Sequence, residues 1–418
     1  MADANYPKSM SYYFLLGASM KPESSFKVCM EKAKRQKAGS FAHIPVDVLR
    51  DILLRLPLSS LLRFKAVNKC WHSLISSHGF AIGRLKSQAN NAGPSSYKYG
   101  VIRVLNIPQR PPQLSLYMHR KAEEEDSDAL IVQTVGLPNP LKLLEDFKDT
   151  NGSQVFGSCN GLLLLGRGKK PEQFILWNPS TGQDKELPLN HFCECPITFM
   201  AGLGYDSFSD NYKVVAAVND GGSQLMYIAL YNLRTNSWSM WEKTVFPYKF
   251  SSSCSQPGIT LANGAPHWLL NRHGTGGVAN VIIYFDPVEE NFKELSLPDS
   301  LVGDIFLGVC KGFLCVGSCN QIWIMKEYGV KESWTVLMDF PRYSAGYSIQ
   351  NFEHLMLWQF PKMSTVLLIL DGNSAALFKS NGTKYKAFSF SGYQEGLIIT
   401  AYMESLVSPN NYALCTRD

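Results

Sequence analysis

One short segment of this chain combines residue types that bind metal ions. His191, Cys193 and Cys195 place three soft ligands within five residues. Zinc knuckles, however, separate their cysteines by two residues and have a second ligand pair elsewhere, and the chain has neither feature. We therefore interpret this segment as an ordinary loop and predict no metal site.

Four acidic residues could in principle hydrolyse glycosidic bonds, a reaction that needs two carboxylates at a defined separation. Asp206, Asp210, Asp286 and Glu290 are these candidates, and each lies in or beside a predicted turn. Aspartate also forms turns, because its side chain accepts hydrogen bonds from nearby backbone N–H groups. We favour turn formation and predict that the chain is not an enzyme.

Two further segments match known cofactor-binding or catalytic motifs only in part. Gly202 and Gly204 in GLGYDS lack the third glycine and the following helix of a dinucleotide site, so we predict no cofactor. Ser24 and Lys27 have the spacing of a serine-hydrolase tetrad, but they lie in a segment without a sustained pattern. The function must therefore be sought in binding.

Length and composition indicate a globular protein with more than one domain. The chain has 418 residues, of which 45% are apolar and 18% charged, and its net charge of +5 is too small for a dedicated nucleic-acid binder. The apolar run SYYFLLGASM at 11–20 is too short to cross a membrane. Ten scattered cysteines favour reduced thiols, and we expect a location in the cytoplasm or nucleus.

A single region has helical periodicity. Apolar residues between 46 and 56 fall on one stripe until Pro57 ends the run, Ser59 or Ser60 can begin a second helix, and a third surrounds Trp71. We expect a three-helix domain at 43–85. A flexible extension at 1–40 is expected before it, and a linker at 86–96, rich in Asn, Gly, Pro and Ser, after it.

The helical region has more apolar side chains than it can bury. Sixteen large apolar residues lie between 44 and 75, whereas a domain this small buries only about 60% of its chain surface. Val48 and Leu54 also lie off the main stripe. We infer that some of these side chains contact a partner protein. The alternative, that they pack on the rest of the chain, is disfavoured because a linker intervenes.

Basic residues near Trp71 raise a second possibility for this region. Arg55, Arg63, Lys65 and Lys69 could suggest a module that reads DNA. The basic residues of 43–85 exceed the acidic ones by only four, however, and they are spread over three helices. We interpret them as a solvated face and predict no nucleic-acid partner.

The rest of the chain, 97–418, alternates short apolar runs with turns. An aromatic residue followed by a polar turn recurs, and the step between Trp177, Tyr231 and Phe285 is 54 residues each time. Repeats of this size made of β-hairpins are typical of propeller blades, and 322 residues suffice for about six. We predict an all-β, propeller-like (kelch-like) domain, with a solenoid or a sandwich as alternatives.

The helical region resembles an F-box over its whole length, 44–85. It has the hydrophobic-Pro opening Ile44-Pro45, Leu-Pro at 56–57, Leu-Leu-Arg-Phe at 61–64, and Trp71. One departure is Asn68, where the family more often has serine. The resemblance implies an α+β multidomain protein, in which a small three-helix F-box precedes the propeller-like domain.

The remainder resembles the C-terminal domain of plant F-box proteins of the F-box-associated type, a group that includes S-locus F-box proteins. The landmarks are GSCNGLLLL (157–165), WNPSTG (177–182), GLGYDSFSDNYKVV (202–215), GVKESWTVL (329–337) and AYMESLVSP (401–409). Their order and spacing carry the resemblance, since each motif by itself is weak.

The resemblance implies the substrate-recognition subunit of an SCF-type (Skp–cullin–F-box) ubiquitin ligase. The F-box would bind a Skp-family adaptor, and cullin indirectly, while the C-terminal domain captures an unknown protein for ubiquitination. A non-degradative interaction scaffold is the alternative. The adaptor-binding residues implied by position are Ile44, Pro45, Leu49, Ile52, Leu53, Leu56, Pro57, Leu61, Leu62, Val67, Cys70 and Trp71.

Overall fold

The computed structural model describes eighteen stretches of the chain. They are residues 45–91, 99–105, 113–118, 135–136, 153–167, 173–188, 198–219, 225–250, 260–274, 277–301, 305–310, 312–318, 321–339, 355–357, 365–370, 374–379, 384–389 and 398–412. The expected flexible extension at 1–40 lies outside them, as do Ser24, Lys27 and the segment from His191 to Cys195.

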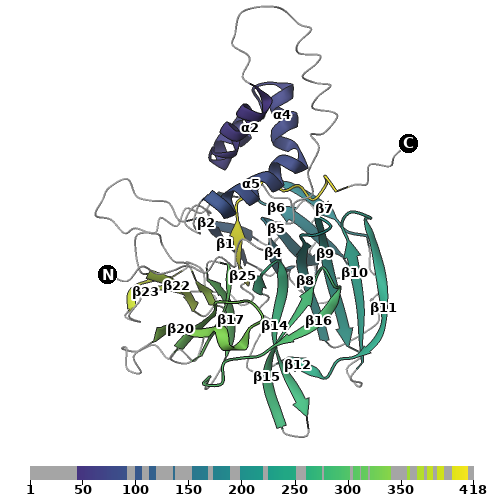
Figure 1. Cartoon of the computed structure of the whole chain (residues 1–418), viewed down its shortest axis with the longest axis vertical. Helices are drawn as coiled ribbons and strands as arrows, with labels where there is room; N and C mark the ends of the chain where they lie inside the picture. Colours follow the sequence, from purple (N-terminus) through teal and green to yellow (C-terminus); the bar gives the residue numbers. More distant parts are fainter. Residues whose placement is uncertain are drawn as a thin grey trace, which may run out of the picture.

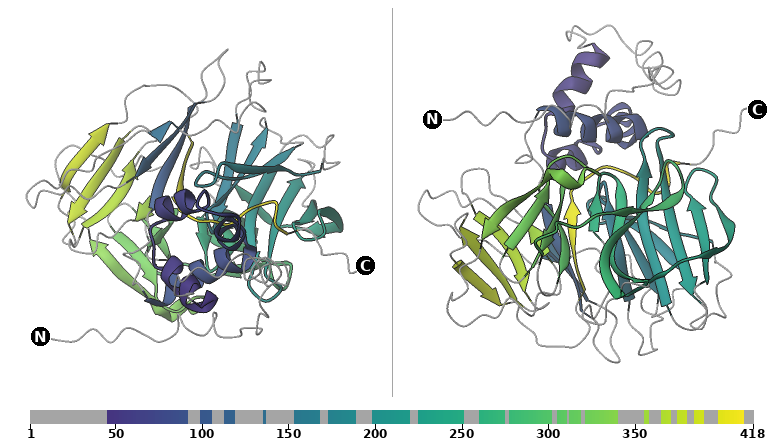
Figure 2. Two further views of the ribbon diagram at one scale, coloured as in Figure 1. Left: turned by 90° about the horizontal axis from the view of Figure 1, so that it is seen from above. Right: turned by 60° about the horizontal axis from the view of Figure 1, so that its bottom comes forward.

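The described residues form a helical unit at one end of an all-β domain (Figure 1). Seen from above, the sheets lie around a common centre and the helices lie over them (Figure 2). The predicted order of a short helical region and a propeller-like β domain is therefore confirmed.

The helical unit contains α2 (Val46–Leu54), α3 (Leu58–Phe64), α4 (Lys69–Ser76) and α5 (His78–Asn91). Pro45 and Pro57 stand directly before α2 and α3, where the first N–H groups have no helical partner and a proline costs no hydrogen bond. Asn68 caps α4, because its Oδ1 accepts a hydrogen bond from the N–H of Trp71 at 2.8 Å. Serine caps helices in the same way, so this departure from the F-box pattern keeps the cap.

The predicted linker at 86–96 is wrong in its first part, because α5 continues to Asn91. The Asn- and Ser-containing composition of 86–91 favours a loop when it is considered by itself. The earlier part of the same helix is held by tertiary packing, since Phe80, Ala81 and Ile82 are buried. A packed helix extends through residues that would not form one alone.

Four sheets follow one another along the chain, each built from neighbouring strands. Sheet one has β4 (Ser153–Cys159), β5 (Leu162–Arg167), β6 (Phe174–Asn178) and β7 (Gln183–Glu186). Sheet two has β8 (Thr198–Asp206), β9 (Asn211–Asn219), β10 (Leu225–Asn232) and β11 (Ser237–Val245). All these neighbours are antiparallel, as short hairpin connections require.

Sheets three and four each have five strands. Sheet three has β12 (Tyr248–Phe250), β13 (Thr260–Ala262), β14 (Ala265–Gly274), β15 (Gly277–Asp286) and β16 (Asn291–Leu295). Sheet four has β17 (Phe306–Cys310), β18 (Phe313–Gly317), β19 (Gln321–Met325), β20 (Trp334–Asp339) and, parallel to β17, β21 (Leu355–Leu357). A 3-10 turn, η4 (Lys331–Ser333), precedes β20.

In the described part of the chain these four sheets are complete blades, so the expectation of about six blades is corrected to four. The estimate divided 322 residues into equal repeats, but the described strands before β4 and after β21 do not keep the repeat. They form the three-stranded sheet of β22 (Thr365–Leu370), β23 (Ser374–Lys379) and β24 (Lys384–Ser389), and a sheet of mixed origin.

The mixed sheet joins the two ends of the β domain. Its strands are β1 (Tyr99–Leu105), β2 (Gln113–Met118), β3 (Val135–Gly136) and β25 (Ile398–Met403). β25 pairs antiparallel with β1, so the last strand of the chain lies beside the first strand after the helices. This pairing joins the two ends of the β domain and closes the ring.

The aromatic repeat marks equivalent positions in three blades. Trp177, Tyr231 and Phe285 are each the second-last residue of the strand that pairs with the last strand of its blade, and all three are buried. The next residue then shapes the following turn. The side chain of Asn232 accepts hydrogen bonds from the N–H groups of Arg234 and Thr235, as Asp286 does from Val288 and Glu289.

Candidate protein-docking surfaces

Three apolar side chains of the helical unit face outward. Val48 and Ile52 on α2 are 49% and 46% exposed, and Val67 after α3 is 58% exposed. We call these residues the apolar trio. Val48 and Ile52 are one helical turn apart and therefore share a face of α2. Exposed β-branched residues do not stabilise a helix, so their presence on this face indicates an interaction surface.

The residues implied as adaptor contacts are divided between this surface and the interior. Leu53 and Leu61 are buried, whereas Pro45, Ile52, Pro57 and Val67 are exposed. The partly buried members are Leu49, Leu56, Leu62, Cys70 and Trp71. Ile44 lies outside the described residues. Sequence periodicity cannot distinguish the exposed residues from the buried ones, because both groups are apolar and recur at helical spacing.

The helical unit and the β domain share one hydrophobic core. The core cluster that contains Leu53, Leu61 and Ile75 also contains Phe174 and Tyr212 of the β domain. The view that a linker keeps the two parts separate is therefore wrong for the buried side chains. They belong to a core that continues into the β domain, while the apolar trio is exposed.

A polar contact joins the same two parts beside this core. Nε2 of His78, the first residue of α5, lies 2.6 Å from Oδ2 of Asp210 in the turn between β8 and β9. The hydroxyl of Tyr205 donates to the other carboxylate oxygen of Asp210 at 2.7 Å. Burial alone would raise the pKa of Asp210, but these hydrogen bonds and the charge of His78 outweigh it and lower the pKa.

Comparison with protein families settles what these two parts are. Residues 41–82 match the model of the F-box domain, and residues 117–409 match the model of the F-box associated beta propeller domain. The second match covers more than half of the chain.

The chain belongs to the F-box associated β-propeller family.

Similar curated proteins come from Arabidopsis thaliana. F-box protein CPR1 is 27% identical over 396 residues, which cover 86% of this chain and 88% of that protein. F-box/kelch-repeat protein At3g23880 is 28% identical over 388 residues, covering 88% and 96%. A solved structure of the Dos1 propeller covers 61% of this chain and 67% of its own, at 13% identity and a TM-score of 0.33, and nothing about this chain follows from it.

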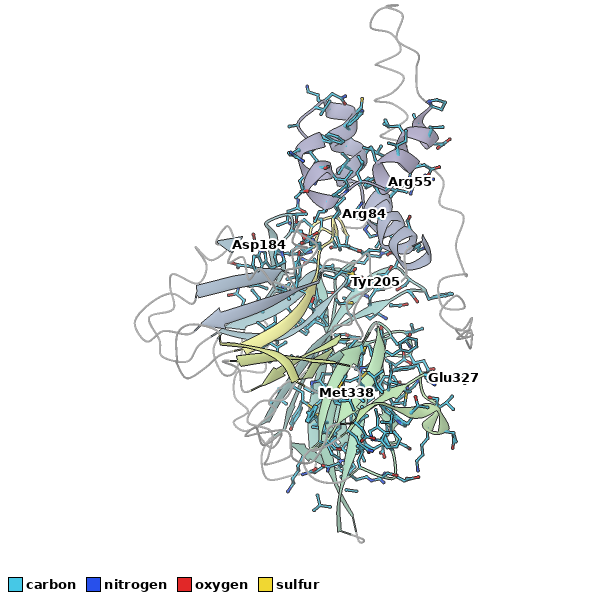
Figure 3. All side chains as sticks on the ribbon, turned by 90° about the vertical axis from the view of Figure 1, so that its left-hand side faces the viewer. Arg55, Arg84, Asp184, Tyr205, Glu327 and Met338 are labelled. Atoms are coloured by element: carbon cyan, nitrogen blue, oxygen red, sulfur yellow. The ribbon has the colours of Figure 1, made fainter. Side chains whose placement is uncertain are left out.

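Arg84 of α5 fixes the end of α2 in the F-box (Figure 3). This buried side chain donates from Nη1 to the carbonyl oxygens of Leu54 at 3.1 Å and Leu56 at 2.7 Å. The last carbonyls of a helix have no partner within it, so the guanidinium satisfies groups that would otherwise be left unpaired. Sequence reasoning counted Arg84 only as surface charge.

Arg84→Met is expected to destabilise the F-box by about 2 kcal/mol, because two partly buried carbonyls lose their donor. Amide hydrogen exchange of α2 measures this local loss without requiring the propeller to unfold. Arg55→Met removes an exposed arginine at the end of the same helix and should change the exchange by less than about 0.5 kcal/mol. Equal effects of the two substitutions would show that capping by Arg84 is unimportant.

The four carboxylates considered for glycoside hydrolysis lie in turns or directly before them, where they bind backbone N–H groups or form ion pairs. Asp206 accepts hydrogen bonds from the N–H groups of Phe208 and Ser209, as Asp286 does in its own turn. Asp210 and Glu290 both occupy the left-handed backbone region, with φ of 52° and 58°, that completes such a turn. Neither matched family model is that of an enzyme.

The glycines of GLGYDS have a packing role between blades. A Cβ on Gly202 would meet the side chains of Pro266 and Trp268 of sheet three, and one on Gly204 would meet Pro287. They permit close contact of blades two and three, which explains the motif without a nucleotide.

In the described part of the chain, no three His, Cys, Asp or Glu side chains are grouped as metal ligands would be. No helix among those residues is both long and apolar enough to span a bilayer.

Proposed function

We propose that this protein is the substrate-recognition subunit of an SCF-type ubiquitin ligase. Its F-box binds a Skp-family adaptor, which brings cullin indirectly, and its propeller captures the protein to be ubiquitinated. The observation that carries the proposal is the outward-facing apolar trio on an F-box whose buried apolar residues belong to a core shared with the propeller.

The trio provides the affinity that such docking needs. Burying a valine or isoleucine side chain contributes about 1.5 to 3 kcal/mol, so three give several kcal/mol before partly buried neighbours such as Trp71 contribute. Association costs at least about 4 kcal/mol. The proposed contact therefore requires the trio and part of its surroundings together.

The protein acts by positioning, not by chemistry of its own. A receptor that holds its target on one domain and the ligase on another raises the effective concentration of the target near the bound ubiquitin. An F-box that is packed on the propeller favours this role. A fixed distance between target and ligase raises the effective concentration more than a flexible tether does.

The end of the propeller opposite the F-box is the proposed capture surface. The turn after β8 contacts α5 through Asp210, so β9 begins near the F-box and ends at the opposite side. The exposed side chains described at that side are Val245 of sheet two and Lys249, Arg272 and Val278 of sheet three. Connections near 167–173, 219–224 and 271–279 follow strands with this direction, and loops at such an end commonly carry binding residues.

We also propose that the protein works in the cytoplasm or the nucleus. In the described part of the chain, Cys159 and Cys315 are thiols that form no disulfide. Reduced cysteines suit a compartment that keeps thiols reduced.

Affinity capture of the tagged full chain from plant tissue tests the function. We expect the Skp-type adaptor and cullin to be recovered together, with one or more further proteins whose abundance rises when the gene is lost. Recovery of the adaptor without cullin, and with no protein rising in abundance, would favour the non-degradative scaffold instead.

A further inference from the structure

The chain beyond β25 runs from the propeller to the F-box. Residues 404–412, which we call the strap, follow the ring-closing strand and pass beneath the helices (Figure 1), as the view from above also shows (Figure 2). Residues 405–408 and Tyr412 are buried, although they belong to no helix or strand. A buried irregular segment requires partners for its backbone, and those of Ser405 and Val407 come from the propeller.

The propeller holds the first half of the strap. Nδ2 of Asn178, at the end of β6, donates to the carbonyl oxygens of Ser405 at 3.1 Å and Val407 at 2.6 Å. Ser180 and Tyr402 are also hydrogen-bonded through their hydroxyls. WNPSTG, a landmark of the sequence, therefore supplies the polar groups that the buried strap needs.

A second landmark leaves space for the strap. Gly161, in SCNG, has a φ of +83°, and a Cβ there would lie 2.7 Å from the carbonyl oxygen of Met403 and would overlap the Ser405 side chain. Only glycine combines this backbone conformation with so close an approach.

The second half of the strap holds the F-box. Nδ2 of Asn411 donates to the carbonyl oxygen of Ser76 at 2.8 Å, a group at the end of α4 that the helix leaves unpaired. The ring of Tyr412 meets the ring of His78 edge to face at 4.5 Å and that of Tyr212 at 5.4 Å. His78 in turn contacts Asp210 of the propeller.

We propose that the strap is a positioning element that fixes the orientation of the F-box on the propeller, with Asn411 and Tyr412 as its positioning residues. The proposal extends the function proposed above, because orientation matters only if the F-box carries the ligase. The Asn411 contact joins residues 335 positions apart in the chain, so it depends on the folded C-terminal end.

The position of the strap couples F-box orientation to completion of the propeller. It begins directly after β25, whose pairing with β1 closes the ring. A propeller that has not closed cannot place residues 404–412 beneath the helices. Such a chain retains the apolar trio and binds the adaptor, but it holds the target at no fixed position relative to the ligase.

Asn411→Ala combined with Tyr412→Leu tests the proposal in the full chain. The leucine keeps an apolar side chain in the core, while the hydrogen bond to Ser76 and the ring contact with His78 are lost. Asn410→Ala is the matched control, because Nδ2 of Asn410 donates to the carbonyl oxygen of Asp184 on the propeller and contacts no helix of the F-box. Asn411→Gln with Tyr412 unchanged retains a donor and should restore wild-type behaviour.

Pulsed electron paramagnetic resonance measures the orientation directly. Spin labels on encoded unnatural residues at His72 of the F-box and Val330 of the propeller, both exposed, spare the ten native cysteines. One narrow distance is expected for wild type and for the Asn410→Ala control, and loss of that single distance for the double variant. An unchanged narrow distance in the double variant, with its thermal unfolding also unchanged, would overturn the proposal.

The assembled ligase gives a second measurement. With purified adaptor, cullin and ubiquitin enzymes, self-ubiquitination of the double variant should be about tenfold slower and spread over more lysines, at unchanged adaptor affinity. Wild-type rate and lysine pattern in that variant would contradict a positioning role. If wild-type protein itself binds no adaptor, the proposed function fails, while the distance measurement still decides whether the strap orients the F-box.

Discussion

Replacing Ile52 and Val67 together by aspartate is expected to weaken binding of the Skp-type adaptor by a factor of about a hundred or more. Both side chains are about half exposed, so the folded F-box tolerates the change. Each substitution removes about 1.5 kcal/mol or more of apolar contact, and each places a carboxylate where the adaptor must exclude water. A loss of about 3 kcal/mol corresponds to a hundredfold change in affinity.

Isothermal titration of purified adaptor into the full chain measures this effect. Val288→Asp with Val336→Asp is the matched control, since these propeller residues are 50% and 42% exposed and lie outside the F-box. The control should bind as wild type does. Leu53→Asp is a poor substitute, because Leu53 is buried in the core shared by the two domains and its loss disturbs both. Unchanged affinity in the Ile52 and Val67 variant would remove the trio from the interface.

Lys213→Ala is expected to reduce the free energy of unfolding of the propeller by about 3 kcal/mol or more. Nζ of Lys213 lies 3.2 Å from Asp206 in its own blade and 2.7 Å from Glu290 in the next, and it donates to the carbonyl oxygen of Pro287 at 2.6 Å. The side chains of Lys213 and Asp206 are both only 6% exposed. Removing the lysine therefore leaves a buried carboxylate without its cation.

Chemical denaturation of the full chain measures the loss, and a second variant identifies its cause. Adding Asp206→Asn to Lys213→Met removes the buried charges as a pair, and it should recover much of the stability because no buried charge is left uncompensated. Lys331→Ala removes a cation from an ion pair with Asp299 that is largely exposed, and should change stability by less than about 1 kcal/mol. Equal losses from Lys213→Ala and Lys331→Ala would contradict the account.

The ion pair between Lys213 and Asp206 also makes the stability of the propeller depend on pH. Burial alone would raise the pKa of Asp206, but hydrogen bonds from Ser209 and Lys213 outweigh it and lower the pKa. A carboxyl group with a lowered pKa stabilises the fold above its unfolded pKa, about 3.9, and this contribution is lost as the pH falls through the folded value. Without Lys213 the pKa of Asp206 rises toward its unfolded value, so the part of the acid-induced loss of stability that comes from Asp206 should be smaller than in the wild type.

The sequence predicted those parts of the fold that depend on local pattern. The helical stripe that ends at Pro57 identified α2, and the steps between Trp177, Tyr231 and Phe285 identified equivalent strands of three successive blades. Both signals work because a buried face must recur at the period of its element.

Contacts between distant residues could not be predicted in this way. Leu53 and Ile52 are adjacent and both apolar, yet one enters the shared core and the other faces outward. The division depends on where the propeller lies, which helical periodicity does not contain. Asn411 has a role only because β25 returns to β1, and the Asn- and Ser-containing end of α5 is helical because its beginning is packed.

Assembly from purified components tests the central claim most directly. Full-length protein, a Skp-type adaptor and cullin are mixed and analysed by size-exclusion chromatography with light scattering. We predict a single complex with one copy of each component, in which cullin is retained only when this chain and the adaptor are both present. A chain that elutes alone, or that binds the adaptor and thereby excludes cullin, would contradict the claim.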